Sequence, residues 1–142
     1  MHRLDATEEL LAKVSLFAGL RPKELHRVAS LMTRVEVPAG TTLTRQGTSG
    51  HEFIIILGGE AEVTRDGEHI ATVTTGDFQG EISLLDGGPR TATVTTTTAT
   101  TVMVATRGEF LALLDEAPEI ARQMLPALAH RVRAHNAAAH TH

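Results

Sequence analysis

The stretch that decides the fold is Gly76-Asp77-Phe78-Gln79-Gly80-Glu81-Ile82-Ser83-Leu84-Leu85-Asp86-Gly87-Gly88-Pro89-Arg90-Thr91-Ala92-Thr93-Val94. A strand ends at a glycine turn, and Gly80 then precedes a segment, 82–85, that is long enough for one helical turn. A turn rich in glycine and proline follows, with Arg90 at the head of the next strand. The stretch therefore predicts a tight loop between two strands of a β-rich domain.

The residue types in this loop favour an anion site. Gly80 has no Cβ, so the backbone there can approach a ligand closely. Unpaired N–H groups at the start of a short helix attract phosphate. Arg90 offers a planar fork of donors to the same group, whereas Glu81 would repel a phosphate but accept hydrogen bonds from sugar hydroxyls. The combination suits a sugar phosphate, and the alternative is a plain Glu81–Arg90 salt bridge without a ligand.

The chain around this loop has β-rich character between two helical ends. From Thr33 onward, Val35 and Val37 alternate with polar residues, which predicts a half-buried strand. Asp66-Gly67 predicts a hairpin, and glycine turns separate further β-rich pieces at 41–44, 53–57, 61–65, 69–73 and 91–104. The threonine-rich part of the last piece is read as strand and not as low complexity, because threonine is β-branched.

Helical patterns flank these strands. Thr7 is the expected cap of a first helix, and Pro22 begins a second one with an apolar face. A short helix is expected from Arg107, and Pro118 opens the next. Its apolar stripe is either core or a dimer seam, and its members are Ile120, Met124, Leu128 and Val132. Pro126 should kink this helix, and the tail after Asn136 should fray.

The sequence resembles the cyclic-nucleotide-binding domain family. The likeness rests on 79–85 and 89–94, which are similar to the family's phosphate-binding cassette. It extends over about 8–135 through the turns at 38–40, 46–47 and 59–63 and the lead-in residues 16–20 and 24–25. It departs from the family where Gln79 replaces phenylalanine and Ser83 replaces alanine, which bears on affinity more than on identity.

The resemblance implies a mainly β fold with flanking helices, a double-stranded β-helix of jelly-roll type. We expect one domain over 1–142, with a helical lead-in at 7–32 and a β-roll at 33–105. The cassette should span 79–94, and C-terminal lid helices should span 107–136.

The resemblance also assigns roles within the site. Glu81 should accept the ribose 2′-hydroxyl, and Arg90 should pair with the cyclic phosphate. Thr91 is expected to add a hydroxyl donor. The remaining pocket lining is backbone amides, from Gly80, Ile82, Ser83 and Ala92. His135 and Asn136 on the lid helix are candidates for base contacts, with solvated tail residues as the alternative.

The implied function is a regulatory sensor that binds cAMP as first choice, or cGMP, and moves its terminal helices in response. It is not expected to be an enzyme or to need a cofactor. One alternative is a ligand-free family member that acts as a protein-interaction module. Another is a cupin-like metalloenzyme, disfavoured because His26, His51 and His69 are isolated and His140 and His142 lie in the tail.

Composition narrows the remaining classes. The formal net charge of −4 gives no electrostatic footprint for nucleic acid, so direct nucleic-acid binding is not expected. There is no cysteine, and no apolar signal core or membrane-spanning run. We therefore expect a cytoplasmic protein without membrane contact. Its expected partners are a second copy in a homodimer, or an effector domain that is either fused or separate.

Overall fold

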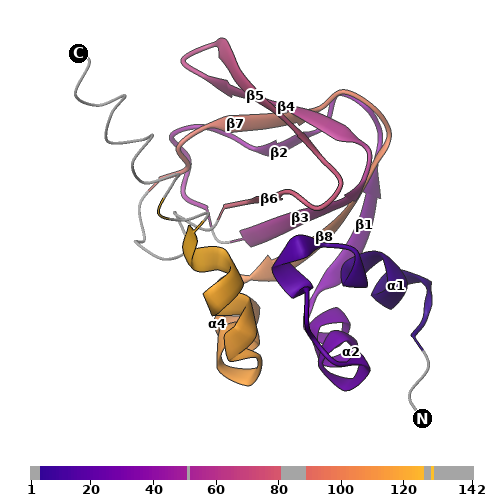
Figure 1. The fold of residues 1–142 in the computed structure, drawn as a ribbon. Helices are drawn as coiled ribbons and strands as arrows, with labels where there is room; N and C mark the ends of the chain where they lie inside the picture. Colours follow the sequence, from indigo (N-terminus) through magenta and orange to yellow (C-terminus); the bar gives the residue numbers. More distant parts are fainter. Residues whose placement is uncertain (1–3, 51, 81–88, 127–128, 130–142) are drawn as a thin grey trace.

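Two antiparallel sheets packed against each other form the body of the molecule (Figure 1). The computed structural model describes residues 4–50, 52–80, 89–126 and 129. Within these residues, one four-stranded sheet has the order β1 (Thr33–Val37), β8 (Thr100–Thr106), β3 (Glu52–Gly58), β6 (Phe78–Gln79). The other has the order β2 (Thr42–Thr44), β7 (Thr93–Thr96), β4 (Glu60–Arg65), β5 (Glu68–Thr74).

Strand β3 separates two hydrophobic cores, because successive side chains of a strand point to opposite faces. Ile54 and Ile56 point between the sheets, where they meet Val63, Val94 and Val102. The alternate residues of β3 face the helices on the outside of the first sheet, and these residues are Phe53, Ile55 and Leu57. The unbroken apolar run at 53–57 is therefore a strand buried on both faces.

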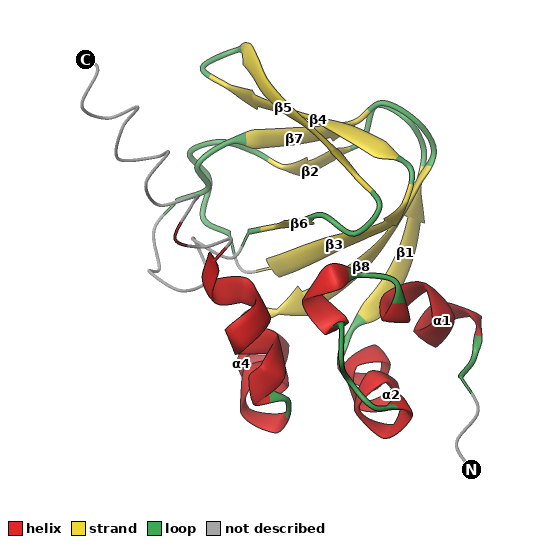
Figure 2. Cartoon of the chain, viewed as in Figure 1, coloured by secondary structure: helices red, strands yellow, loops and turns green. Residues whose placement is uncertain are grey.

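The helices lie together on the outer side of the first sheet (Figure 2). They are α1 (Ala6–Ala12), the 3-10 turn η1 (Ser15–Phe17), α2 (Pro22–Leu31) and α4 (Arg107–Glu116), followed by helix over 118–126. Pro22 begins α2 as predicted. The prediction that Thr7 caps the first helix is wrong: Asp5 is the N-cap, and its carboxylate accepts from the Glu8 amide at 2.8 Å.

The long threonine-rich piece is not one strand. It divides into β7 and β8, which belong to different sheets. The chain turns between them at 97–99, where the Thr98 hydroxyl accepts from the Glu60 amide at 3.0 Å and the Thr97 hydroxyl donates to the Glu60 carbonyl at 3.2 Å. Threonine hydroxyls can form hydrogen bonds with the backbone of a turn, and threonine side chains also fit a strand. The threonine content of this piece therefore did not predict the turn.

Two further strand predictions have different outcomes. The hairpin at Asp66-Gly67 is confirmed, with both residues at positive φ (54° and 80°) between β4 and β5. The half-buried character of β1 is wrong, because Val35 is 37% exposed. Strand β1 lies at the edge of its sheet, where its neighbour is β8.

The described residues contain no helix that is both long and apolar enough to cross a membrane.

Candidate ligand site around Arg90

Arg90 is fixed by the loop that precedes β3. Its amide donates to the Thr48 carbonyl at 2.8 Å, and its carbonyl accepts from the Gly47 amide at 2.9 Å. An isolated antiparallel bridge joins Ser49 to Pro89. These contacts hold 47–50 against the segment that leads into β7, so the Arg90 backbone is positioned by residues some forty places earlier in the chain.

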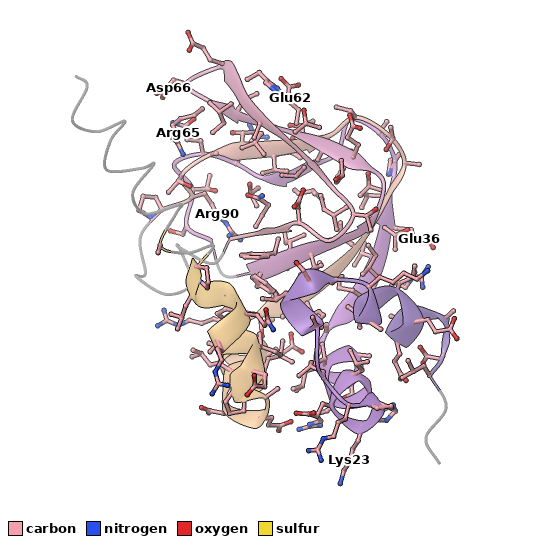
Figure 3. The ribbon with its side chains drawn as sticks, viewed as in Figure 1. Lys23, Glu36, Glu62, Arg65, Asp66 and Arg90 are labelled. Carbon is pink, nitrogen blue, oxygen red and sulfur yellow. The ribbon has the colours of Figure 1, made fainter. Side chains whose placement is uncertain are left out.

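The guanidinium of Arg90 lies inside the molecule, as Figure 3 shows between β6 and α4. The residue is 6% exposed, and Nη2 donates to the Glu52 carbonyl at 2.7 Å. A charged group is removed from water only at a cost unless it is hydrogen-bonded. An arginine is a planar, permanently charged donor, so its burial beside a loop is an arrangement suited to gripping an anion.

Gly80 forms one wall beside Arg90. Residues 78 and 79 of β6 pair with Ile55 and Ile54 of β3, which brings Gly80 to the start of β3. Gly80 has a φ of +95°, and a Cβ there would lie far inside van der Waals contact of Arg90 Nη1 and of the Glu52 carbonyl oxygen. Glycine is thus required at this position both for its backbone conformation and for space.

The residues after Arg90 are tied to the second sheet. Nε of Arg65, at the end of β4, donates to the Thr91 carbonyl at 3.1 Å. The Ala92 carbonyl accepts from the Thr44 hydroxyl at 3.2 Å. The tip of the β4–β5 hairpin is fastened nearby, because the Gln46 side chain and Asp66 exchange two hydrogen bonds of 2.8 and 2.9 Å. Arg65, Asp66 and Arg90 therefore gather on one side of the roll (Figure 3).

Four of the residues that the resemblance assigned to the site lie within the described part of the chain. Gly80 and Arg90 are brought into contact, and Thr91 and Ala92 continue directly from Arg90 into β7. Glu81, Ile82, Ser83, His135 and Asn136 lie outside the described residues, as do Leu128 and Val132 of the predicted stripe. Ile120 and Met124 of that stripe are buried in the helical core.

Sequence reasoning missed three residues that shape this site: Gly50, Glu52 and Arg65. Glu52 contributes a backbone carbonyl, which has no side-chain signature. Gly50 matters through a contact with a residue far along the chain. Arg65 carried the one available signal, since it directly precedes the Asp66-Gly67 turn and so sits at a hairpin tip.

The histidines within the described residues do not gather. His26 Nδ1 lies 3.0 Å from Glu8, and His69 Nδ1 lies 3.2 Å from Glu62. No group of three or more potential metal-ligating side chains occurs in the part of the chain that the structure describes.

A separate cavity of about 220 Å³ opens between α2 and α4. Arg21 and Arg27 line it, each paired with a carboxylate, Glu24 and Glu116 respectively. Hydrogen bonds from these arginines lower the pKa of both carboxyl groups, while partial burial opposes the shift. Two carboxylates stand in this lining beside its cations, Arg21, Arg27 and Lys23, so the cavity is a poorer candidate for an anion than the loop around Gly80.

Part of the chain matches a known family of ligand-binding domains. The profile of the cyclic nucleotide-binding domain covers residues 34–117, which span β1 to the end of α4. The chain belongs to the cyclic nucleotide-binding domain family. The predicted family and the predicted mainly β fold with flanking helices are confirmed, and the domain is a regulatory, ligand-binding one.

Curated relatives of this domain are regulators of two kinds. The CRP-like cAMP-activated global transcriptional regulator of Mycobacterium tuberculosis is 32% identical over 134 residues, which cover 91% of this chain and 60% of the relative. The cAMP-dependent protein kinase regulatory subunit of Yarrowia lipolytica is 37% identical over 109 residues, which cover 75% of this chain and 28% of the relative. The chain therefore spans less than two thirds of the length of these relatives.

Solved structures agree. The Thermus thermophilus catabolite activator protein superposes with a TM-score of 0.78 at 29% identity, covering 89% of this chain and 62% of that one. A structure of Sp-2Cl-cAMPS bound to PKAR CBD2 gives 0.77 at 26% identity, covering 91% and 88%. The N-terminal domain of a Streptomyces coelicolor transcriptional regulator gives 0.68 at 32% identity, covering 91% and 96%.

These relatives correct one prediction. The expectation of no direct nucleic-acid binding is wrong, because several similar proteins are transcriptional regulators. The reasoning failed because the charge of one domain says nothing about a second domain, and the regulator from Mycobacterium tuberculosis is considerably longer than the matched region.

Proposed function

We propose that this chain is the sensor domain of a regulatory protein and that its ligand is cAMP. The observation that carries the proposal is the buried guanidinium of Arg90, held beside Gly80. The choice of cAMP is supported by relatives from bacteria and fungi whose names specify cAMP activation or cAMP dependence. Two solved relatives hold cAMP itself, from a PfPKA-R and from Toxoplasma gondii PKA.

The proposed binding mode divides the ligand between the two charged anchors. Arg90 donates to the cyclic phosphate, and Glu81 accepts from the ribose 2′-hydroxyl. Backbone amides of Gly80, Ile82, Ser83 and Ala92 line the pocket, with the Thr91 hydroxyl beside them. His135 and Asn136 are the candidates for contact with the base.

The route from the ligand to the terminal helices begins at Glu52. Its carbonyl accepts from Arg90, and the next residue, Phe53, packs its ring against Phe110 of α4 with centroids 4.6 Å apart. Phe53 also packs against Phe78, two residues before Gly80, at 5.7 Å. A phosphate bound by Arg90 therefore acts, through the Glu52 carbonyl, on the start of β3 and, through Phe53, on α4.

Titration calorimetry tests the ligand assignment. The purified chain is first freed of any carried nucleotide by unfolding and refolding. It is then titrated with cAMP, with cGMP and with 5′-AMP, which has the same base and sugar but an open phosphate. Micromolar or tighter binding of cAMP, with weaker cGMP and much weaker 5′-AMP, is the expected result. Tighter binding of cGMP would overturn the choice of cAMP, and no heat with any of the three would overturn the sensor.

A further inference from the structure

Gly50 lies against the arginine of the candidate site, although no turn or motif demands a glycine there. Its φ is outside the left-handed region, so its φ does not call for glycine. A Cβ on Gly50 would lie 2.5 Å from Cδ of Arg90 and closer still to Nε and Cζ. The requirement for glycine at position 50 is therefore one of space alone.

Two glycines from distant parts of the chain bound the same side chain. Gly50 precedes β3 and adjoins the inner part of the arginine, from Cδ to Cζ. Gly80 follows β6 and adjoins Nη1 and Cζ. The Glu52 carbonyl receives Nη2 at 2.7 Å. Together these groups form a slot that fixes both the depth and the direction of the guanidinium.

We infer that Gly50 is a positioning residue for Arg90, and that any side chain at position 50 pushes the guanidinium out of its slot and weakens binding of a cyclic phosphate. The inference rests on the proposed function. It adds to that proposal a residue that touches no ligand and acts only through the arginine.

The two glycines differ in what a methyl group would disturb. At Gly80 the methyl would meet the backbone carbonyl of Glu52 as well as Arg90, and the φ of +95° would be strained. Gly80→Ala should therefore damage both fold and affinity. At Gly50 the three nearest atoms all belong to the Arg90 side chain, which can move to another rotamer. Gly50→Ala should therefore damage affinity far more than fold.

The test is a double-mutant cycle in cAMP affinity over the parent, Gly50→Ala, Arg90→Ala and the double variant. Gly50→Ala should weaken binding by about ten- to a hundredfold, part of the loss expected for an arginine–phosphate pair. In the Arg90→Ala background, the same substitution should change affinity by less than about twofold, because the clash is gone. Gly58→Ala is the matched control, since Gly58 also has no positive φ and an added methyl there would have no atom within 4 Å.

The outcomes separate the inference from the function that it rests on. A parent that binds cAMP and a Gly50→Ala variant that binds equally well would overturn the inference and leave the sensor standing. Equal losses in both backgrounds would also overturn it, because they indicate a general effect on the loop.

A double-mutant cycle in melting temperature, on the same four proteins, tests the inference without any ligand. Gly50→Ala should lower the melting temperature when Arg90 is present and leave it unchanged when Arg90 is alanine. If Gly50→Ala alone fails to fold, the double variant should fold, and its failure to do so would contradict the slot. If the parent binds none of the nucleotides, the proposed function is overturned. The melting temperatures of the four proteins would still test whether Gly50 positions Arg90.

Discussion

At the scale of single residues, the central feature is a guanidinium that the fold keeps out of water. Arg90 is 6% exposed and donates to a backbone carbonyl, so a substantial desolvation cost is accepted at this position. Charged groups in such perturbed surroundings are common at functional sites. Buried positions usually hold apolar residues, and Arg90 is an exception beside a loop with an unusual sequence.

Arg90→Ala removes the phosphate partner while leaving the backbone amides of the loop. We expect cAMP binding to weaken by about 2–5 kcal/mol, the range for removing one partner of a buried charged pair. Arg90→Lys keeps the charge but loses the planar fork, so it should recover only part of this loss. Calorimetric titration of both variants measures the effect, and parent-like affinity of Arg90→Ala would remove Arg90 from the site.

The sequence predicted the site residues whose role depends on their neighbours along the chain, and it missed those whose role depends on distant residues. Arg90 and Gly80 were identified because their neighbours along the chain form a recognisable stretch. Gly50 and Glu52 were not, because one acts through an absent side chain and the other through a carbonyl. Both meet Arg90 across some forty residues of sequence, a proximity that only the paired strands create.

At the scale of elements, buried threonine hydroxyls tie the sheets to their turns. Thr96 of β7 is 2% exposed, and its hydroxyl donates to the Pro38 carbonyl at 2.8 Å and accepts from the Thr41 amide at 2.8 Å. The same residue exchanges backbone bonds with Gly40 and Thr41. One side chain therefore fastens the turn between β1 and β2 to the neighbouring strand.

Thr96→Val keeps the shape of this side chain and removes both hydroxyl bonds. Because the Thr41 amide and the Pro38 carbonyl then each lose a partly buried hydrogen bond, we expect a loss of about 1–3 kcal/mol in the free energy of unfolding. Thr96→Ser keeps the hydroxyl and should lose less. Denaturant unfolding measures the difference, and a valine variant as stable as the parent would show that the hydroxyl bonds contribute nothing net.

A surface ion pair connects α2 to α4. Nη2 of Arg27 donates to Oε1 of Glu116 at 2.8 Å, and Nε donates to the other carboxylate oxygen. These hydrogen bonds, together with the positive charge, hold the pKa of the Glu116 carboxyl below its ordinary value, with partial burial acting in the opposite direction. The pair is exposed, so its effect on stability should be small.

The pH dependence of this pair has a definite sign. Because the folded pKa of Glu116 lies below the unfolded value, the contribution to stability is present above the unfolded pKa and is lost as pH falls through the folded pKa. Arg27→Ala should raise the pKa of Glu116 toward its ordinary value, as measured by carboxyl NMR titration. Arg122→Ala is the matched control, because Arg122 pairs with Glu119 instead, and an unshifted Glu116 in Arg27→Ala would contradict the contact.

Element prediction succeeded where a pattern had one meaning. Asp66-Gly67 is a strong hairpin signal, and the apolar run at 53–57 has the length of a strand and is short for a helix; both predicted elements appear. The threonines of 91–104 suit both a strand and a turn, so the break between β7 and β8 was invisible. The valines of β1 alternate as in a half-buried strand, but whether a face is covered depends on what packs on it.

At the scale of the whole molecule, the outer face of the first sheet and the helices share one of the two cores. The helical core includes Phe53, Ile55 and Leu57 of β3 together with Phe110 and Leu113 of α4. Close-packed interiors transmit small displacements because they cannot deform gradually. A change at the start of β3 is therefore expected to reach α4.

Hydrogen exchange of the parent chain, with and without saturating cAMP, reads ligand binding and helix coupling in a single experiment. We predict slower exchange in the loop at 47–50 and in 89–92, where the ligand is gripped, together with altered exchange in 107–126. Unchanged exchange throughout would contradict the proposal that this chain senses cAMP. Slower exchange confined to the loop would leave binding in place and contradict the coupling to α4.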